Sequence, residues 1–573
     1  MNRSLKILFL CFTLVILMAN IAHAVCVNKG GGVWETADNT AEAVNVCVGA
    51  ASAGDTINVK AGLGAVTWPA AAVTIPSSKP LQIIGPGRDN LSITLGGSYA
   101  FLISPYVGTP ELPATRISGF KFISPYEAKR VAIQARGQGW RIDHCAYEGI
   151  ESQALSSTSI FVIASGVNTT VEPYGLVDNN IIINGKVVPN GFSTFIKESG
   201  VWSEALGLGT ANAVYIENNH FISNKAERKL FVDLTHSGKY VVRYNTFVNG
   251  WILAHGLQTD SMRGTRHWEI YGNAFSTPTT SYNAAIALLS GTGVVFNNDF
   301  TGVGSFLPVM EFGHERSNAA IGAAGRCDGT SGWDGNLDAT GWPCRDQIGT
   351  STDASLWSSS ATLPAPVQTL APAYVWSLLD NGALKNPAVS HNAPTHIREN
   401  RDYYRYNTTS CAAGGASCTA GVGCGTLTNR PATCTPGVAY WATNQSCTDM
   451  TSMVGANPST PISGTLYKCT APNTWTVHYT PYTYPHPLRS GVQPPAPPQT
   501  FALTTSKSGT GTITSNPAGI NCGSTCTYSF TSGELVTLTA TPGSGYTFSN
   551  WTGACTGTGT CSDRKSTRLN SSH

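Results

Sequence analysis

Two histidines and two arginines gather in one short stretch of the chain, where His255 is followed by Arg263, Arg266 and His267. Side chains of these types can remove the proton beside a carboxylate and stabilise the enolate that forms, which is the chemistry of a β-elimination. We therefore take these four as candidate catalytic residues. The sequence assigns no metal ligands, and calcium stays an open candidate as a cofactor.

Successive side chains of a strand point to opposite faces, so this stretch divides into two sides. Thr265, His267 and Glu269 share one side, and Arg266 and Trp268 share the other. Trp268 and Glu269 are therefore candidate substrate contacts beside the catalytic set. The competing interpretation is a solvated loop, in which an arginine stacks on Trp268 and forms a salt bridge with Glu269.

More polar residues lie before and after this stretch, at intervals that a repeating fold could bring into register. Lys229 belongs to the earlier group, and His314 and Arg316 belong to the later one. Aligned on neighbouring coils, these residues would extend one polar strip. We therefore count Lys229, His314 and Arg316 among the candidate substrate-binding residues.

A repeated sequence pattern indicates which elements position these side chains. In this pattern, called the Asn step, an Asn is followed two residues later by an aromatic or aliphatic residue. The step begins at Asn180, Asn219, Asn245, Asn273 and Asn298. Its copies are 39, 26, 28 and 25 residues apart, and the same beat separates Phe122 from Tyr147 upstream. A period in the twenties with short strands indicates a solenoid, whose coils bury a core only by stacking.

Equivalent residues of a solenoid lie above one another. We expect an interior apolar stack made of Phe122, Tyr147, Ile182, Phe221, Phe247, Phe275 and Phe300. The five asparagines should form a ladder at a turn, because Asn tolerates left-handed geometry and both donates and accepts hydrogen bonds. Cys145 falls on the ladder position of its own coil, so we interpret it as a buried, unpaired thiol rather than a nucleophile.

Residues of about 45 to 310 resemble the pectate-lyase-like superfamily of right-handed parallel β-helices, in the Asn steps and in first coils over 54–59 and 81–87. Residues 39–51 have the apolar spacing of a helix that caps the open end. The superfamily holds lyases, hydrolases, adhesins and phage spikes, so the resemblance implies an all-β fold and not an activity. Its alginate and chondroitin lyases carry a basic residue before a His-Gly pair, where this chain has Ala254 before His255.

The two ends of the chain have patterns of their own. Arg3 and Lys6 precede an apolar run, and Ala22-His23-Ala24 offers a small-x-small cleavage site, which together predict a signal peptide and a secreted bacterial protein. No second apolar stretch predicts a membrane span. Residues 563–573 resemble the translation of a sequencing adapter, and we leave them out of the fold prediction.

Composition limits the class of partner. Lys+Arg number 35 and Asp+Glu 33, and this balance stays near zero when the two end segments are left out. Such a charge would not draw the protein onto nucleic acid. Only 12% of the residues are charged, and 60 are Gly, which is typical of a turn-rich β protein. We expect a monomer whose partner is a polysaccharide or a cell-surface glycan.

Sixteen cysteines occur, of which Cys11 lies in the signal peptide. An exported protein should oxidise the others that lie close together. The expected disulfide cysteines are Cys26, Cys47, Cys327, Cys344, Cys411, Cys418, Cys424, Cys434, Cys447, Cys469, Cys522, Cys526, Cys555 and Cys561. The six between Cys411 and Cys469 allow about fifteen connectivities, among which the sequence does not choose. Metal binding is the rival interpretation of Cys522 and Cys526, although export favours a disulfide.

The expected organisation is a signal peptide (1–24), a β-helix (25–310), a Cys- and Pro-rich cap and flank (311–490), a Pro-rich linker (491–500) and a small β module (501–562). The module resembles the bacterial surface repeat related to internalin B repeats, which implies a spacer or an adhesive stalk. Two functions follow as hypotheses. One is a polysaccharide-binding or polysaccharide-degrading protein, such as a β-eliminating lyase of acidic polysaccharides. The other is a non-catalytic cell-surface or adhesive protein.

Overall fold

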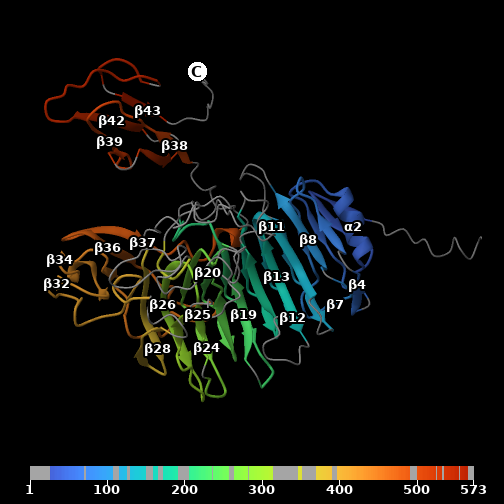
Figure 1. The fold of residues 1–573 in the computed structure, drawn as a ribbon. Helices are drawn as coiled ribbons and strands as arrows, with labels where there is room; N and C mark the ends of the chain where they lie inside the picture. Colours follow the sequence, from blue (N-terminus) through green and yellow to red (C-terminus); the bar gives the residue numbers. More distant parts are fainter. Residues whose placement is uncertain are drawn as a thin grey trace, which may run out of the picture. The chain divides into compact units, whose positions relative to one another are not determined.

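Short strands stack in register along most of the chain, as the computed structural model shows (Figure 1). The structure describes residues 26–564 except 63, 70–71, 98, 107–114, 126–129, 150–158, 166–171, 191–205, 227, 235–236, 257–263, 282, 314–345, 351–369, 390–396, 491–499, 524–525, 532–534, 554 and 560. The expected signal peptide, Arg263, His314, Arg316, Cys327 and Cys344 therefore lie outside the described residues. The chain divides into two compact units, Met1–Pro494 and Pro495–His573.

Each coil of the first unit contributes strands to three parallel ladders. The first ladder contains β2 (Val33–Glu35), β3 (Thr56–Asn58), β6 (Gln82–Ile84), β9 (Thr115–Ser118), the second half of β11 (Arg130–Asp143), β14 (Tyr174–Asp178), β17 (Val214–Glu217), β20 (Lys239–Arg243), β23 (His267–Tyr271), the first part of β26 (Thr292–Thr301), the first part of β28 (Ala373–Asp380) and β31 (Tyr403–Arg405). The second ladder contains β4 (Val66–Trp68), β7 (Ser92–Leu95), β10 (Lys121–Ser124), β12 (Ala146–Gly149), β15 (Ile181–Ile183), β18 (His220–Ile222), β21 (Thr246–Val248), β24 (Ala274–Ser276) and the ends of β26 and β28.

The third ladder contains β5 (Val73–Ile75), β8 (Phe101–Tyr106), the first half of β11, β13 (Ser159–Ser165), β16 (Lys186–Asn190), β19 (Lys229–Leu234), β22 (Gly250–Ala254), β25 (Ile286–Leu288), β27 (Met310–Phe312) and β30 (Ala388–Val389). Two strands pair antiparallel at the edges, β1 (Val27–Gly30) with β2 and β29 (Ala383–Lys385) with β28. The expected right-handed parallel β-helix is confirmed.

The parallel ladders extend further along the chain than the repeat pattern suggested. Strands β28, β30 and β31 continue the first and third ladders beyond residue 310, where we expected a cap to begin. The reason is the long insertion in the sequence between β27 and β28, which interrupts the period on which the prediction rested. The solenoid therefore includes residues up to about Arg405.

The interior aromatic stack has the expected members. Phe247 lies 4.9 Å from Phe221 and 4.7 Å from Phe275 between ring centroids, and Phe275 lies 5.0 Å from Phe300, with all three ring pairs stacked. Nearer the N-terminus, the same register position of successive coils is occupied by Phe122, Tyr147 and Ile182. This stack fills the interior beside the second ladder.

The ladder asparagines are fully buried at the turn between the first and second ladders. The Oδ1 atom of Asn273 accepts from the backbone N–H of Asn245 at 3.0 Å and from its Nδ2 at 3.0 Å, and the same pattern repeats along the row. Cys145 takes the next place, because its N–H donates to Oδ1 of Asn180 at 2.9 Å. The left-handed geometry belongs to the preceding residue of each turn, such as Asn218 or Tyr244, and not to the ladder Asn as we expected.

Helix α2 (Ala41–Ala50) covers the first coils, as the spacing of its apolar residues predicts. Thr40 caps its N-terminus by accepting from the N–H of Ala43. Val44, Cys47 and Val48 face the core of the solenoid, and a disulfide joins Cys47 to Cys26. This cap shields the apolar end that stacking alone would leave open.

Residues after β31 form a disulfide-linked flank with its own sheets. The flank contains β32 (Ser417–Cys418), β33 (Val422–Gly425), η4 (Leu427–Asn429), β34 (Thr433–Cys434), β35 (Ala439–Ala442), β36 (Thr465–Ala471), β37 (Thr474–Tyr479) and η5 (Pro487–Ser490). Its disulfides join Cys411 to Cys418, Cys424 to Cys447 and Cys434 to Cys469. A second apolar core forms between this flank and the outer face of the first ladder, with Phe296, Trp376 and Trp441 at its centre.

The second unit is a small antiparallel module. It contains a two-stranded sheet of β38 (Thr500–Thr504) and β41 (Thr527–Thr531), and a four-stranded sheet of β40 (Asn521–Cys522), β39 (Gly511–Asn516), β42 (Leu535–Pro542) and β43 (Cys561–Arg564). Disulfides join Cys522 to Cys526 and Cys555 to Cys561. Strand β43 includes residues 563 and 564, which we had left out of the fold prediction.

Candidate functional site

His267 and Glu269 are fully buried and bonded to each other, so they do not face solvent. The Nε2 atom of His267 lies 3.1 Å from Oε1 of Glu269, and its Nδ1 lies 2.9 Å from the carbonyl oxygen of Leu206. Glu269 also accepts from the N–H of Gly209 at 2.8 Å and from the Tyr479 hydroxyl at 2.7 Å. Burial lowers the pKa of His267, against the opposing effect of Glu269. This correction places the pair in the packing of the solenoid rather than on a substrate surface.

Trp268 and Arg266 are also fully buried. Trp268 points into the interior of the solenoid, where its Nε1 donates to the carbonyl oxygen of Ser290 at 3.0 Å. A sugar cannot reach this indole, which corrects the expectation that Trp268 contacts substrate. Strand alternation predicted that Arg266 and Trp268 share one face. It could not predict that the opposite face, with His267 and Glu269, is covered by another segment.

The cover over that opposite face is a segment of the flank, residues 479–490, which crosses the outer side of the first ladder. Arg243 donates to the carbonyl oxygens of Tyr482 at 2.6 Å and Thr483 at 2.9 Å. Three coils earlier in the ladder, Arg141 donates to the carbonyl oxygen of Arg489 at 3.0 Å. These contacts between distant parts of the sequence make the first ladder a packed interface.

The third ladder keeps a polar trio on its outer face, made of Lys186, Asp233 and His255. The Nε2 atom of His255 lies 2.8 Å from Oδ1 of Asp233, and Nζ of Lys186 lies 2.6 Å from Oδ2. The side chain of His255 is 17% exposed, against 10% for Asp233 and 6% for Lys186. Of the four candidate catalytic residues, His255 is the one that the structure places at a surface, while Arg263 lies outside the described residues.

The register of the third ladder brings this trio together. Asp233 in β19 pairs with Leu253 in β22, and His255 follows directly after β22. Leu234 and Ala254 point inward to the core, so their neighbours Asp233 and His255 point outward. Lys186 begins β16 on the preceding coil and reaches across to the same carboxylate.

Two apolar clusters lie on the same outer face as the trio. One spans β11 to β16 and contains Val131, Ile160 and Val188, with Tyr99 and Ile163 packed against it. The other spans β19 to β25 and contains Leu253, Ala284 and Ala287, with Leu230, Trp251 and Leu289 packed against it. Trp251 is half-buried, so part of its indole stays accessible. The three core members of each cluster are buried, whereas the residues packed against them, Trp251 among them, are partly exposed.

The electrostatics of the trio hold the imidazole of His255 in one orientation. Although burial raises it, contacts with His255 and Lys186 lower the pKa of Asp233 to about 2, so the carboxylate is ionised at neutral pH. A neutral imidazole beside an ionised carboxylate donates its Nε2–H, which leaves Nδ1 as the basic nitrogen. This is the arrangement by which an aspartate orients a histidine base.

Three substrate-contact candidates remain. His314 and Arg316 lie outside the described residues, and Lys229 occupies a structural position. Lys229 is buried at the start of β19. Its neighbour Arg228 donates to Ser281 Oγ and the Asn283 carbonyl oxygen, each at 2.6 Å, and lies over the Phe306 ring. Burial lowers the pKa of Arg228 to about 10. Arg228 therefore links the start of β19 to the segment between β24 and β25.

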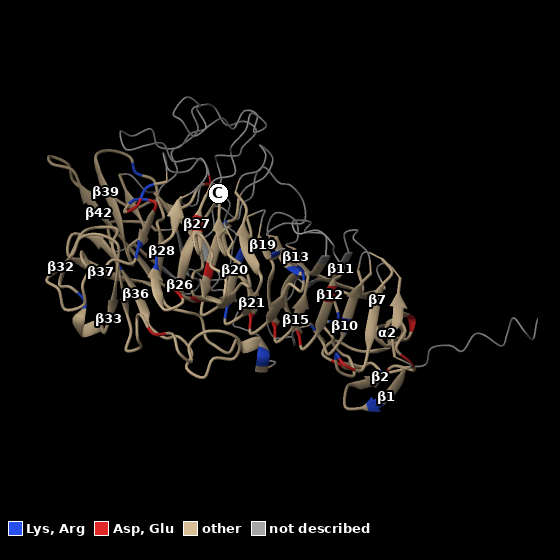
Figure 2. Cartoon of the chain, turned by 90° about the horizontal axis from the view of Figure 1, so that it is seen from below, with Lys and Arg blue, Asp and Glu red and all other residues tan. Residues whose placement is uncertain are grey.

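Charged residues are sparse along the ribbon (Figure 2), in agreement with their 12% share of the sequence. Within the part of the chain that the structure describes, no group of three or more His, Cys, Asp or Glu is placed to hold a metal ion. Among the same residues, no helix is long and apolar enough to cross a bilayer.

Sequence reasoning missed Lys186, Asp233 and Trp251. A signal for two of them was present, because Trp251, Leu253 and His255 alternate with inward-facing residues, and Asp233 interrupts an apolar run in β19. Lys186 carried no such signal, since its contact depends on the register between coils.

The fold and this surface define a parallel β-helix protein with a polar trio on the outside of its third ladder. Residues 501–570 match the family model described as the divergent InlB B-repeat domain, so the match extends past residue 562, where we expected the module to end. Among solved structures, a PL6 family polysaccharide lyase from Pseudopedobacter saltans is similar, at 11% identity over 63% of this chain and 98% of that chain, with a TM-score of 0.25. A likeness at this level supports no inference about activity. No curated protein matches the chain.

Proposed function

We propose that this protein is an extracellular polysaccharide-binding β-helix protein that holds an acidic polysaccharide along the outer face of its third ladder and cleaves it by β-elimination. The observation that carries the proposal is the 2.8 Å contact between Nε2 of His255 and Oδ1 of the ionised Asp233, on the same outer face as the half-buried Trp251. The pair of His255 and Asp233 supplies an oriented base, and the accessible part of the Trp251 indole supplies an apolar surface for a sugar ring.

In this mechanism Nδ1 of neutral His255 takes the proton beside the uronate carboxylate. The electron pair forms the new carbon–carbon double bond, and the bond between the sugar and the glycosidic oxygen breaks. The imidazolium, stabilised by Asp233, returns the proton to the leaving oxygen. Lys186 acts as a positioning residue, because its ammonium holds the other carboxylate oxygen and keeps Asp233 ionised.

The test is an incubation of the full chain with alginate, pectate and glycosaminoglycans, with calcium supplied. Unsaturated products absorb at roughly 235 nm, as β-elimination chemistry requires. The proposal expects a signal on one of these polymers and its loss in His255→Ala, while the matched variant His220→Ala, which removes an exposed histidine of β18, keeps the activity. Absence of signal on every acidic glycan would overturn the lyase assignment.

A specific observation favours a second function, a non-catalytic surface or adhesive role. It is the match of residues 501–570 to the divergent InlB B-repeat domain. Binding of one of these polymers without release of unsaturated product would support this alternative over the lyase.

A further inference from the structure

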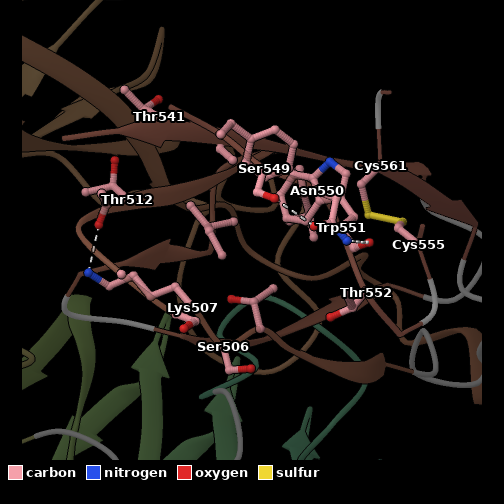
Figure 3. A pocket seen from close by; sticks show the side chains of 18 of the residues that line it. Ser506, Lys507, Thr512, Thr541, Ser549, Asn550, Trp551, Thr552, Cys555 and Cys561 are labelled. Atoms are coloured by element: carbon pink, nitrogen blue, oxygen red, sulfur yellow. Dashed lines mark hydrogen bonds between the residues drawn. A yellow bond between two sulfur atoms is a disulfide. The ribbon is translucent and has the colours of Figure 1, made fainter. Parts of the chain in front are cut away.

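The small module contains a pocket formed entirely by its own residues (Figure 3). Its volume is about 660 Å³, which lies within the range of about 300–1,000 Å³ common for small-molecule sites. The pocket is independent of the third ladder, since every residue that lines it belongs to the second unit.

One side of the pocket is apolar and held in place. Phe548 and Trp551 lie 5.1 Å apart between ring centroids, and Nε1 of Trp551 donates to the carbonyl oxygen of Gly559 at 3.0 Å. The disulfide between Cys555 and Cys561 ties the loop after Trp551 to strand β43. The indole therefore forms a fixed wall of the pocket.

Polar side chains complete the lining, as Figure 3 shows for Thr512, Thr541, Ser549 and Asn550. Lys507 is the single charged residue among the described residues that line the pocket, and none of them is Asp or Glu. Its Nζ donates to the carbonyl oxygen of Gly511 at 2.7 Å, which holds the ammonium beside the start of β39. The pocket thus combines an aromatic wall, hydroxyl and amide groups and one positive charge.

We propose that this pocket binds a sugar residue that carries a carboxylate, that is, a uronic acid unit of an oligosaccharide. The aromatic wall suits the apolar face of a pyranose ring, and the Thr, Ser and Asn side chains can exchange hydrogen bonds with its hydroxyls. Lys507 selects for the carboxylate by charge complementarity, because no acidic group among the described lining residues opposes it. The inference stands apart from the third-ladder site and adds a second point of contact with a polymer.

The experiment is calorimetric titration of the full chain with trigalacturonate and with its methyl ester, which lacks the charges. The parent chain for all variants carries Trp251→Ala, so that binding at the third ladder is weakened and the pocket dominates the titration. We expect this parent chain to bind trigalacturonate more tightly than the methyl ester. Lys507→Gln should weaken the binding of trigalacturonate about ten-fold and abolish this preference, because one charge contact is lost. Lys507→Arg should keep the preference, and the control Lys29→Gln, an exposed lysine of β1, should change nothing.

Equal binding of the charged and methylated trimers, or no binding of either, would overturn the proposal. Equal binding of a triglutamate peptide would overturn the sugar as the ligand class. If Trp251→Ala leaves the binding of the wild-type chain unchanged, the third-ladder site fails while the test of the pocket stands.

Discussion

His255, directly after β22, and Asp233 in the neighbouring strand β19 lie with 2.8 Å between Nε2 and Oδ1. The carboxylate is shared with Lys186, 2.6 Å away on its other oxygen. A histidine held in this way is oriented before any substrate arrives, so each member of the trio makes a separate, testable contribution.

Replacement of the carboxylate should remove the orientation of the base. We expect Asp233→Asn to lower kcat/KM about 10²–10⁴-fold, because an amide neither stabilises the imidazolium nor fixes the tautomer of His255. The measurement is the rate of formation of unsaturated product. Asp449→Asn, at an exposed loop position, serves as the control. An Asp233→Asn chain with a native circular dichroism spectrum and full activity would contradict the mechanism.

Trp251 should contribute to binding rather than to the chemical step. It packs against the cluster of Leu253, Ala284 and Ala287 on the outer face that also carries His255. Trp251→Ala is expected to raise KM about ten-fold with a smaller effect on kcat, since uniform binding is lost. A change in kcat alone would contradict this role.

The Asn ladder should carry measurable stability. The Nδ2 of Asn245 donates to the carbonyl oxygens of Ile216 and Arg243 as well as to the next ladder residue, and all these groups are buried. We expect Asn245→Ala to lower the free energy of unfolding by about 2–4 kcal/mol, because several buried polar groups lose their partners. Asn283→Ala, at an exposed position, should have little effect in the same denaturant titration.

Cys145 allows the Asn ladder to be tested by adding an amide, because it occupies a ladder position and has no amide of its own. Burial raises the pKa of this thiol to about 12, and its Sγ lies 3.3 Å from the carbonyl oxygen of Asp143. Cys145→Asn should therefore be tolerated within about 1 kcal/mol, since an amide at this position can extend the row. A destabilisation as large as that of Asn245→Ala would show that the row ends at Asn180.

His478 should make the flank sensitive to acid. Burial, together with the nearby charge of Lys468, lowers the pKa of His478 to about 4, against about 6.5 in an unfolded chain. Between these values the unfolded state binds more protons, so stability rises with pH through the window and is lost as the pH falls from about 6.5 to 4. We expect His478→Gln to flatten this part of the stability profile by about 3 kcal/mol. Val477→Gln, on the same strand and exposed, should leave the slope unchanged.

The fold was predictable because its signals are local and repeated. The five Asn steps and the residues that follow them occupy equivalent turns and stack positions, so one period in the sequence defines many coils. The end of the solenoid was not predictable, because the insertion before β28 hides the last coils. The covering of the first ladder depends on contacts such as Arg243 with Tyr482, between segments far apart in sequence.

The site was predictable only in part for the same reason. Alternation in β23 separated His267 and Glu269 from Trp268, but alternation cannot tell a solvent-facing side from one that another segment covers. His255 emerged as a candidate because of its residue type. Its partner Asp233 lies on another coil, so the pairing depends on the register of the ladder and on nothing in the local sequence.

The central claim is that the third ladder binds the polysaccharide. Hydrogen–deuterium exchange of the full chain, with and without an oligosaccharide of the polymer that it binds, tests this claim most directly. The account predicts slower exchange in peptides that contain β16, β19 and β22, around Lys186, Asp233 and His255, and unchanged exchange in the second ladder around Phe247. Protection confined to the second ladder, with the third unchanged, would contradict it.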